Sequence, residues 1–173
     1  MSPRVDPLRP AQFDREEKTM DHETRETFWK AFEDSPYIMM KLEGSHEHSE
    51  PMTAQLDKDA HHAIWFFLPR SNRIAAGGAA NGHVATKGHD TFASLTGLLV
   101  EETDASVRDK HWNTVVESWF PNGKNDPNVL MLRFDIKDSE VWVADMSLKG
   151  KFKMLTGQPV KAHEAGEHAT GRV

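Results

Sequence analysis

The stretch HHAIWFFLPRSNRI, residues His61–Ile74, joins a short apolar run to a basic end. The run, Ala63–Leu68, is too short for a helix and rich in aromatic residues, which is typical of a strand buried on both faces. Pro69 ends the run, and Arg70 and Arg73 follow it. The segment therefore predicts a core strand whose end either presents two guanidinium groups to an anionic ligand or caps the edge of a sheet.

Length and composition limit the class of protein. The 173 residues suit one domain with its own core. With 21 Lys and Arg against 27 Asp and Glu, the formal net charge is −6, which gives little support to a nucleic-acid or anionic membrane partner. The absence of cysteine excludes disulfides, thiolate metal sites and cysteine nucleophiles. No window reaches the roughly 18 apolar residues of a membrane span. We expect a cytoplasmic protein.

The chain divides into three parts by composition. Residues 1–21 are charged and punctuated by proline, which predicts a poorly ordered leader without the apolar core of a secretory signal. Residues 22–157 carry the apolar patterns of a folded domain. Residues 158–173 are rich in His and Gly, and we expect a flexible tail there.

Apolar periodicity predicts helices in three places. Residues 22–35, HETRETFWKAFEDS, place Phe and Trp on one face and end before a proline. A short helix is expected from Ser71, ended by Gly77–Gly78. Residues 104–120 predict the longest helix, with Asp104 as N-cap and one broad apolar face made of Val107, Trp112, Val115, Val116 and Trp119.

The remaining apolar runs predict six or seven strands. They include a hairpin from residues 37–42 and 51–57, two strands at 83–87 and 91–102, and two at 129–136 and 139–145 joined by a tight Lys-Asp turn. No regular alternation of strand and helix occurs. The pattern favours an α+β architecture with an antiparallel sheet closed or half closed into a barrel.

The ten histidines suggest a metal site as one hypothesis. Imidazoles and carboxylates of two segments could supply ligands: His46, His48, His61 and His62, with Glu43, Glu47 or Glu50. Their spacing matches no known closed site. The glycine-rich stretch GGAANG lacks the lysine and the spacing of a phosphate-binding loop, so a flexible turn is expected there.

The aromatic residues support a second hypothesis, a pocket for a flat ring. The candidate walls are Trp65, Phe66, Phe67, Trp112, Trp119, Phe120 and Trp142. The basic end of the Trp65 strand could hold the anionic part of a nucleotide-like cofactor. The alternative is that these aromatic residues form ordinary core and that the arginines cap a sheet edge.

Several segments follow one another as in general stress proteins of the pyridoxamine 5′-phosphate oxidase-like family, which the chain resembles from residue 26 to 156. They are PMTAQLD, IWFFLPRSNRI, VATKGHDTFASLTG, HWNTVVESWFPNGKNDPNVLMLRF and SEVWVAD. The combination of WFF before a basic turn with WFPNGKNDP is the most specific part. The resemblance implies a split β-barrel that binds FMN, or in some members FAD, at a homodimer interface.

The resemblance also implies which residues bind the flavin. The backbone of Met52, Thr53 and Ala54 would line the ring and the ribityl chain. The strand that contains Trp65, Phe66 and Phe67 would lie beneath the ring. The basic turn would take the phosphate with Arg70, Asn72 and Arg73, because guanidinium groups offer forked donors to phosphate oxygens. Trp119 and Trp142 complete the predicted set of cofactor-binding residues, as aromatic walls of the pocket hypothesis above rather than through the resemblance.

One position departs from the family pattern. Relatives usually read Arg-Pro-Met before the flavin strand, whereas this chain reads Glu50-Pro51-Met52. A carboxylate near a phosphate is repulsive. Three functions follow as hypotheses: an FMN-binding stress-related protein acting as an oxidoreductase on a small acceptor, a non-catalytic binding or sensing module on the same fold, and a histidine metal-binding protein. True pyridoxamine phosphate oxidation is not expected, and no catalytic residue is assigned.

Overall fold

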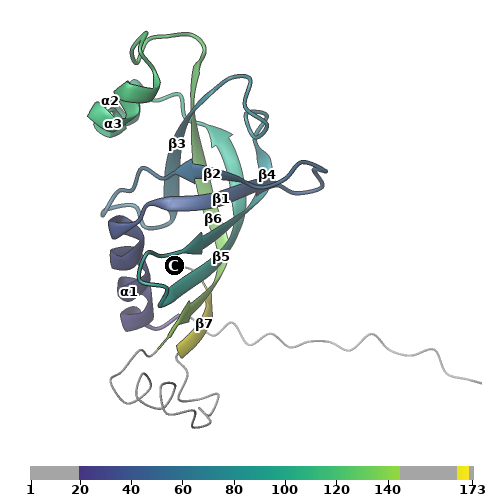
Figure 1. The fold of residues 1–173 in the computed structure, drawn as a ribbon, viewed down its shortest axis with the longest axis vertical. Coiled ribbons are helices and arrows are strands. Elements are labelled where there is room, and N and C mark those ends of the chain that lie inside the picture. Colours follow the sequence, from purple (N-terminus) through teal and green to yellow (C-terminus); the bar gives the residue numbers. More distant parts are fainter. Residues whose placement is uncertain (1–19, 145–166, 172–173) are drawn as a thin grey trace, which may run out of the picture.

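The computed structural model describes residues 20–144 and 167–171. Three helices and one seven-stranded antiparallel sheet make up this part of the chain, which confirms the α+β prediction (Figure 1). The elements are α1 (His22–Asp34), β1 (Tyr37–Leu42), β2 (Glu50–Thr53), β3 (Ala63–Pro69), β4 (Gly78–Ala85), β5 (Thr91–Glu101), α2 (Ala105–His111), α3 (Thr114–Trp119), β6 (Val129–Val143) and β7 (Glu167–Gly171).

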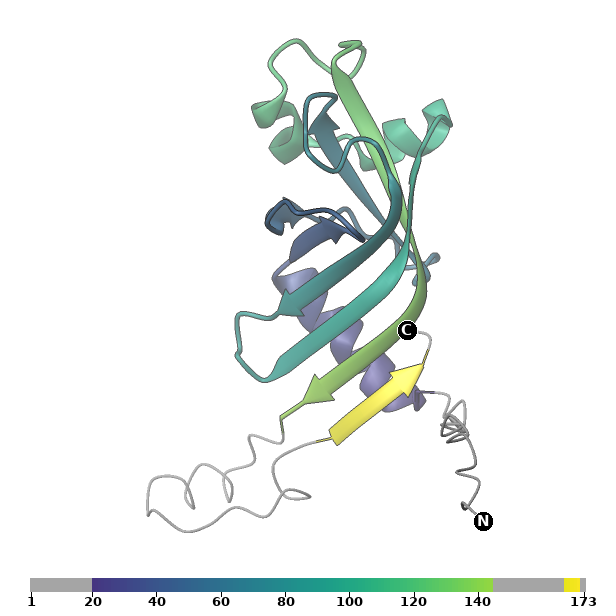
Figure 2. The ribbon, with the colours of Figure 1, turned by 90° about the vertical axis from the view of Figure 1, so that its right-hand side faces the viewer.

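The sheet is a half-closed barrel. Its strand order is β2-β1-β4-β5-β6-β3, and β7 pairs with β6. The long β6 pairs with β5 along one edge, and with β3 and then β7 along the other (Figure 2). The two ends of the strand order meet only at an isolated bridge, where the amide of Gln55 donates to the carbonyl of Trp65 at 2.8 Å. This arrangement agrees with the split barrel that the resemblance implies.

Helix α1 packs its aromatic face onto the sheet. Phe28 and Phe32 are fully buried and stack with ring centroids 5.6 Å apart. The side chain of Asp21 accepts a hydrogen bond from the amide of Thr24 at 2.9 Å and thereby caps the helix. Met20 belongs to the same core. The folded domain therefore includes residues 20 and 21 of the expected leader.

The helix predicted over residues 104–120 is wrong as one continuous element. It is divided into α2 and α3, because the side chain of Asn113 accepts hydrogen bonds from the amides of Val115 and Val116 and caps a new helix. The prediction of one apolar face also fails, since Val115 and Trp119 are exposed. Asp104 caps α2 as predicted.

No helix begins at Ser71. The side chain of Asn72 accepts a hydrogen bond from the amide of Ile74, which favours a turn. Gly78 then begins β4, so GGAANG is mostly strand rather than flexible turn. A Cβ at Gly82 would lie 2.5 Å from Ile38 Cδ1, so this glycine lets β4 pack closely against β1.

The two strands expected around a Lys-Asp turn form one strand, β6. Opposite β5, Gly97 pairs with Ile136 while Thr96 pairs with Asp138, so Lys137 is the extra residue of a β-bulge. Five residues of the expected tail form β7. The rest of that segment, like residues 1–19, lies outside the described residues.

Candidate functional site

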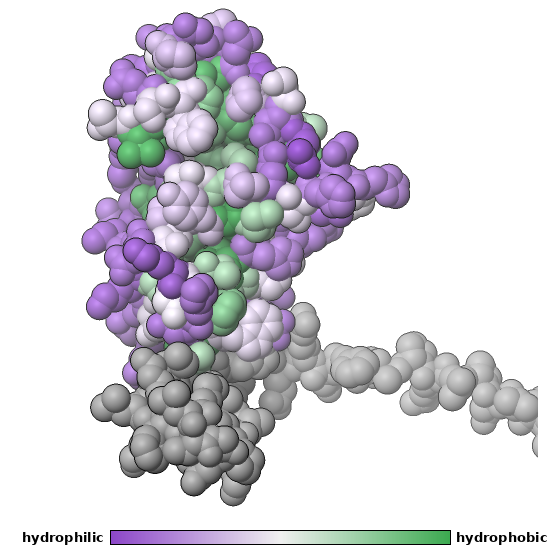
Figure 3. All heavy atoms as spheres, viewed as in Figure 1, coloured by the Kyte–Doolittle hydropathy of each residue, from purple (hydrophilic) through white to green (hydrophobic). Residues whose placement is uncertain are grey.

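A pocket of about 510 Å³ lies between α3 and the strands β2 and β3. We call it the ring pocket. Its described lining is Pro51, Met52, Thr53, Gln55, Phe67, Leu68, Pro69, Asn72, Val115, Val116, Trp119, Phe120, Pro121, Asp126, Asn128 and Val129. On the face that Figure 3 shows, apolar residues form a band along the middle, bordered by hydrophilic residues. The lining is suited to a flat, largely apolar ligand.

The wall of the pocket is held by the N-cap of α3. Asn113 caps that helix with its side-chain oxygen and donates through Nδ2 to Oε1 of Gln55 at 2.8 Å. Gln55 in turn forms the bridge to Trp65 described above. Hydrogen bonds from Asn113 to Gln55 and between Gln55 and Trp65 thus fix α3 relative to β2 and β3.

Phe67 provides the aromatic surface of the pocket. Its ring meets that of Trp112 edge to face, with centroids 5.3 Å apart, and the guanidinium of Arg108 lies 6.0 Å from its centroid. Arg108 also donates through Nη1 to the carbonyl of Lys124 at 3.2 Å. These contacts fix the orientation of the Phe67 ring before any ligand arrives.

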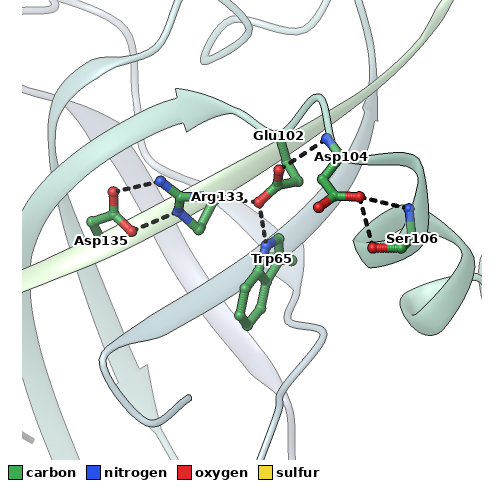
Figure 4. A network of polar contacts seen from close by, with 6 residues as sticks. All are labelled: Trp65, Glu102, Asp104, Ser106, Arg133 and Asp135. Carbon is green, nitrogen blue, oxygen red and sulfur yellow. Dashed lines mark hydrogen bonds and ion pairs between the residues drawn. The ribbon is translucent and has the colours of Figure 1, made fainter. Parts of the chain in front are cut away.

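A buried polar network anchors α2 to the outer face of the sheet (Figure 4). Glu102 accepts hydrogen bonds from Nε1 of Trp65 at 3.2 Å, from Arg133 at 3.0 Å and from the amide of Asp104 at 3.1 Å. Burial would raise the pKa of Glu102, but these three donors outweigh it and lower the pKa. Arg133 also pairs with Asp135 at 2.7 Å, which raises the pKa of the arginine.

His111 covers the other side of the Trp65 ring. The two rings stack with centroids 4.6 Å apart, and His111 is buried. Within the described chain its Nε2 has no hydrogen-bond partner. Desolvation lowers the pKa of His111, opposed by the nearby charge of Asp57. This histidine is therefore a neutral packing group between α2 and β3, without contact with the ring pocket.

Five residues of the predicted site line the ring pocket: Met52, Thr53, Phe67, Asn72 and Trp119. Ala54 is buried just beyond it, and its amide donates to the carbonyl of Pro36 at 2.8 Å. Phe66 points to the opposite face of β3 and is fully buried in the main core, because neighbouring residues of a strand alternate. Trp65 shares the face of Phe67 but lies beneath His111.

Neither arginine of the basic turn lines the ring pocket. Arg70 donates through Nε to the carbonyl of Pro127 at 2.9 Å and through Nη2 to Glu101 at 3.0 Å. Arg73 lies with Nε 3.1 Å from Oε2 of Glu50. The residue that departs from the family pattern thus contacts one of the two cations assigned to the phosphate.

Trp142 lies away from the ring pocket, near the end of β6. It lines a second depression together with Tyr37, Met39 and Phe92, all of them partly exposed. As for the metal hypothesis, no group of three or more possible ligands capable of holding an ion is found in residues 20–144 and 167–171. His61 instead stacks on Trp29 at 5.0 Å.

The family model described as pyridoxamine 5′-phosphate oxidase like matches residues 23–164. The chain belongs to this family. A crystal structure of a general stress FMN/FAD binding protein from Xanthomonas citri is 39% identical, with a TM-score of 0.69 over 74% of this chain and 94% of that chain. General stress protein 26 from Jannaschia sp. is 27% identical, with a TM-score of 0.73 over 87% and 98%. No curated protein matches the chain.

Membership of the pyridoxamine 5′-phosphate oxidase-like family raises the question of whether a flavin fits. The ring half fits, because Phe67 and the apolar lining offer a preformed aromatic site. The phosphate half does not fit as the side chains stand, because Arg70 and Arg73 are both engaged with carboxylates.

Several lining residues were not predicted as site residues. Gln55, Asp126 and Asn128 line the pocket. They belong to PMTAQLD and WFPNGKNDPN, two segments that carry the family resemblance. The signal was therefore present in the motifs, but their spacing alone does not show which side chains converge.

In the described part of the chain, no helix is long and apolar enough to span a membrane.

Proposed function

We propose that the protein binds a flavin through its ring system in the ring pocket. The observation that carries the proposal is the ring of Phe67 on β3, which lines the pocket and is held by an edge-to-face contact with Trp112. Aromatic and aliphatic side chains supply most of the lining. The side-chain oxygens of Gln55 and Asn72 already accept hydrogen bonds within the chain, so these two amides would offer their nitrogens to the polar edge of a ring. Family membership and the name of the Xanthomonas citri protein support the same ligand class.

FMN is the flavin that the resemblance predicts, with FAD as the variant found in some members. FMN, FAD and riboflavin share one ring system, so the ring pocket alone does not choose among them. When bound, a flavin would supply electron-transfer chemistry to an oxidoreductase, and the protein would supply orientation and electrostatics. Asp126 is the ionisable residue of the described lining.

Our proposal includes a homodimer in which the partner covers the open side of the pocket. Trp119 is 74% exposed and Val115 is 61% exposed, although both line the pocket. Large apolar side chains in such exposed positions are typical of interaction surfaces. Light scattering coupled to gel filtration, with and without flavin, tests this part of the proposal. A dimer is expected, and a monomer in both conditions would contradict it.

A second candidate function is a non-catalytic flavin-binding or sensing module. The contact between Glu50 and Arg73 favours it, because it occupies a group that would otherwise help to hold a phosphorylated cofactor. Anaerobic reduction of the bound flavin by nicotinamide cofactors, followed by reoxidation with small acceptors, separates the two functions. Turnover above that of free flavin supports the oxidoreductase, and its absence supports the binding module.

The proposed flavin binding itself is tested by titrating flavin fluorescence with the protein and with Thr53→Trp. The introduced indole would fill the pocket, because Thr53 lines it from β2. Thr103→Trp is the control, since Thr103 is exposed and does not line the pocket. We expect quenching with the natural protein and the control, and its loss with Thr53→Trp. Equal quenching by all three would contradict the assignment of the site.

A further inference from the structure

Arg73 is held by three groups of the segment before and at the start of β2. Its Nε lies 3.1 Å from Oε2 of Glu50, and its Nη1 donates to the carbonyl of His48 at 3.1 Å. Oε2 of Glu47 lies 3.9 Å from the same nitrogen. The side chain of Glu50 is only 19% exposed, so water screens this pair less than an ordinary surface pair. The charge of Arg73 is therefore neutralised within its own chain.

The charge of Arg70 is also neutralised within the chain, but by a different carboxylate. It contacts Glu101 and the carbonyl of Pro127. Both partners of the ion pair are about half exposed, so this contact is the weaker of the two restraints. Neither guanidinium is directed into the ring pocket as the protein stands.

The described lining of the ring pocket is acidic, whereas a phosphate-binding site is normally basic. Among the described lining residues no Lys or Arg occurs, and Asp126 is the charged one. Hydrogen bonds from the amide of Asn128 and from the side chain of Asn122 hold the pKa of Asp126 below its usual value. The carboxylate is therefore ionised at neutral pH and repels an anion in the pocket.

We infer that Glu50 is a specificity-determining residue, and that it makes the pocket bind riboflavin at least as tightly as FMN. The inference rests on the proposed flavin binding. To use Arg73, the phosphate of FMN must first displace Glu50, which exchanges one ion pair for another. The displaced carboxylate would then lose its ion pair in a partly buried place where, within the described chain, Oε1 already has no hydrogen-bond partner. Riboflavin has no phosphate and requires no such exchange.

Glu50→Gln tests the inference, because it removes the charge and keeps the shape. It frees Arg73 for the phosphate, and we expect FMN to bind about tenfold more tightly, since a charge-assisted hydrogen bond is gained. Riboflavin affinity should change less than about threefold. Glu50→Gln with Arg73→Ala should lose the gain. Glu47→Gln is the matched control, because Glu47 is 66% exposed and its contact is the longer one.

The measured quantity is the ratio of the dissociation constants of riboflavin and FMN, determined by fluorescence titration of each variant. Because both ligands are compared on the same protein, a partial loss of folded protein does not change the ratio. Binding of FMN about tenfold tighter than riboflavin by the natural protein overturns the inference and leaves the proposed flavin binding intact. If the ratio of the two dissociation constants is unchanged in Glu50→Gln, the inference is also overturned and the proposed flavin binding is left intact. If neither flavin binds to any variant, the inference and the proposed function both fail.

Discussion

Nε of Arg73 lies 3.1 Å from Oε2 of Glu50, so the acidic residue that replaces the usual family arginine neutralises a second residue assigned to the phosphate. An arginine at position 50 would place a second positive charge beside Arg73, whereas Glu50 and Arg73 together have no net charge. The ring pocket beside the pair keeps its aromatic wall. In this structure Arg73 therefore pairs with Glu50 and does not line the ring pocket.

Replacing Trp119 by alanine should weaken flavin binding without weakening the fold. Trp119 is exposed, so its truncation should change the free energy of unfolding by less than about 0.5 kcal/mol. The loss of one aromatic contact with the ligand should cost about 1 kcal/mol of binding free energy. Fluorescence titration with riboflavin measures the second effect and chemical denaturation the first. Trp119→Phe should retain most of the affinity, and equal affinity in Trp119→Ala would remove this residue from the site.

The free energy of unfolding should fall as the pH falls below the usual histidine pKa of 6.5, in part because of His111. Burial lowers the pKa of His111 in the folded chain, so the unfolded chain binds more protons below pH 6.5. The stability contributed by neutral His111 is fully present above that pH and is lost below it, at up to about 1.4 kcal/mol per pH unit.

His111→Phe should flatten this dependence, because it keeps a ring against Trp65 and removes the titrating group. Urea denaturation at a series of pH values from mildly acidic to mildly basic compares the two proteins. His22→Ala is the control, since His22 is exposed on α1. Parallel curves for the natural protein and His111→Phe would show that the buried histidine does not contribute to the acid side of the stability profile.

Glu102→Ala should destabilise the fold by about 2 to 4 kcal/mol, because it leaves Trp65 Nε1 and the amide of Asp104 without their acceptor. Glu102→Gln keeps an acceptor oxygen and should cost less, about 1 kcal/mol. The neighbouring Glu101→Ala is the matched control, because its exposed pair with Arg70 contributes less than about 1 kcal/mol. Chemical denaturation measures all three. Equal losses for Glu101→Ala and Glu102→Ala would contradict the role of the buried network.

Gly97→Ala should destabilise the barrel by about 2 kcal/mol or more, because an added Cβ would lie 2.2 Å from the carbonyl oxygen of Asp135 at the β-bulge. Gly44→Ala has open space around it and only a positive φ of 71°, so it should cost about 1 kcal/mol. The comparison of their thermal unfolding midpoints checks this prediction. A larger loss for Gly44→Ala would show that the bulge yields easily.

The strands could be predicted from the sequence wherever local patterns decide the structure. The run Ala63–Leu68 forms β3 because its apolar residues satisfy both faces of a strand, and Asp104 caps α2 because its side chain reaches a nearby amide. The continuity of β6 could not be predicted in this way. Lys137 and Asp138 resemble a turn, but pairing with β5 holds them in a strand with a bulge. Tertiary pairing there outweighs the local preference.

For the candidate site, too, the sequence indicates the segments involved but not every contact between them. The resemblance assigned Phe67 and Met52 to the flavin ring and Asn72 to the phosphate, and in the structure all three line one pocket. It could not show that Arg73 turns toward Glu50, because that contact depends on side-chain directions across two segments. The strand face of Phe66 follows from alternation once Phe67 is placed in the pocket. The sequence therefore indicates which segments meet at the pocket, but it does not indicate which charged side chains pair with one another.

The most direct test of the account is to mix the purified protein with riboflavin or FMN, separate free ligand by gel filtration, and record the visible absorption of the protein peak. The account predicts that flavin absorption elutes with the protein, that riboflavin is retained at least as well as FMN, and that Thr53→Trp retains neither. A protein peak without flavin absorption after exposure to either ligand would contradict the central claim that the pocket between α3, β2 and β3 binds a flavin ring.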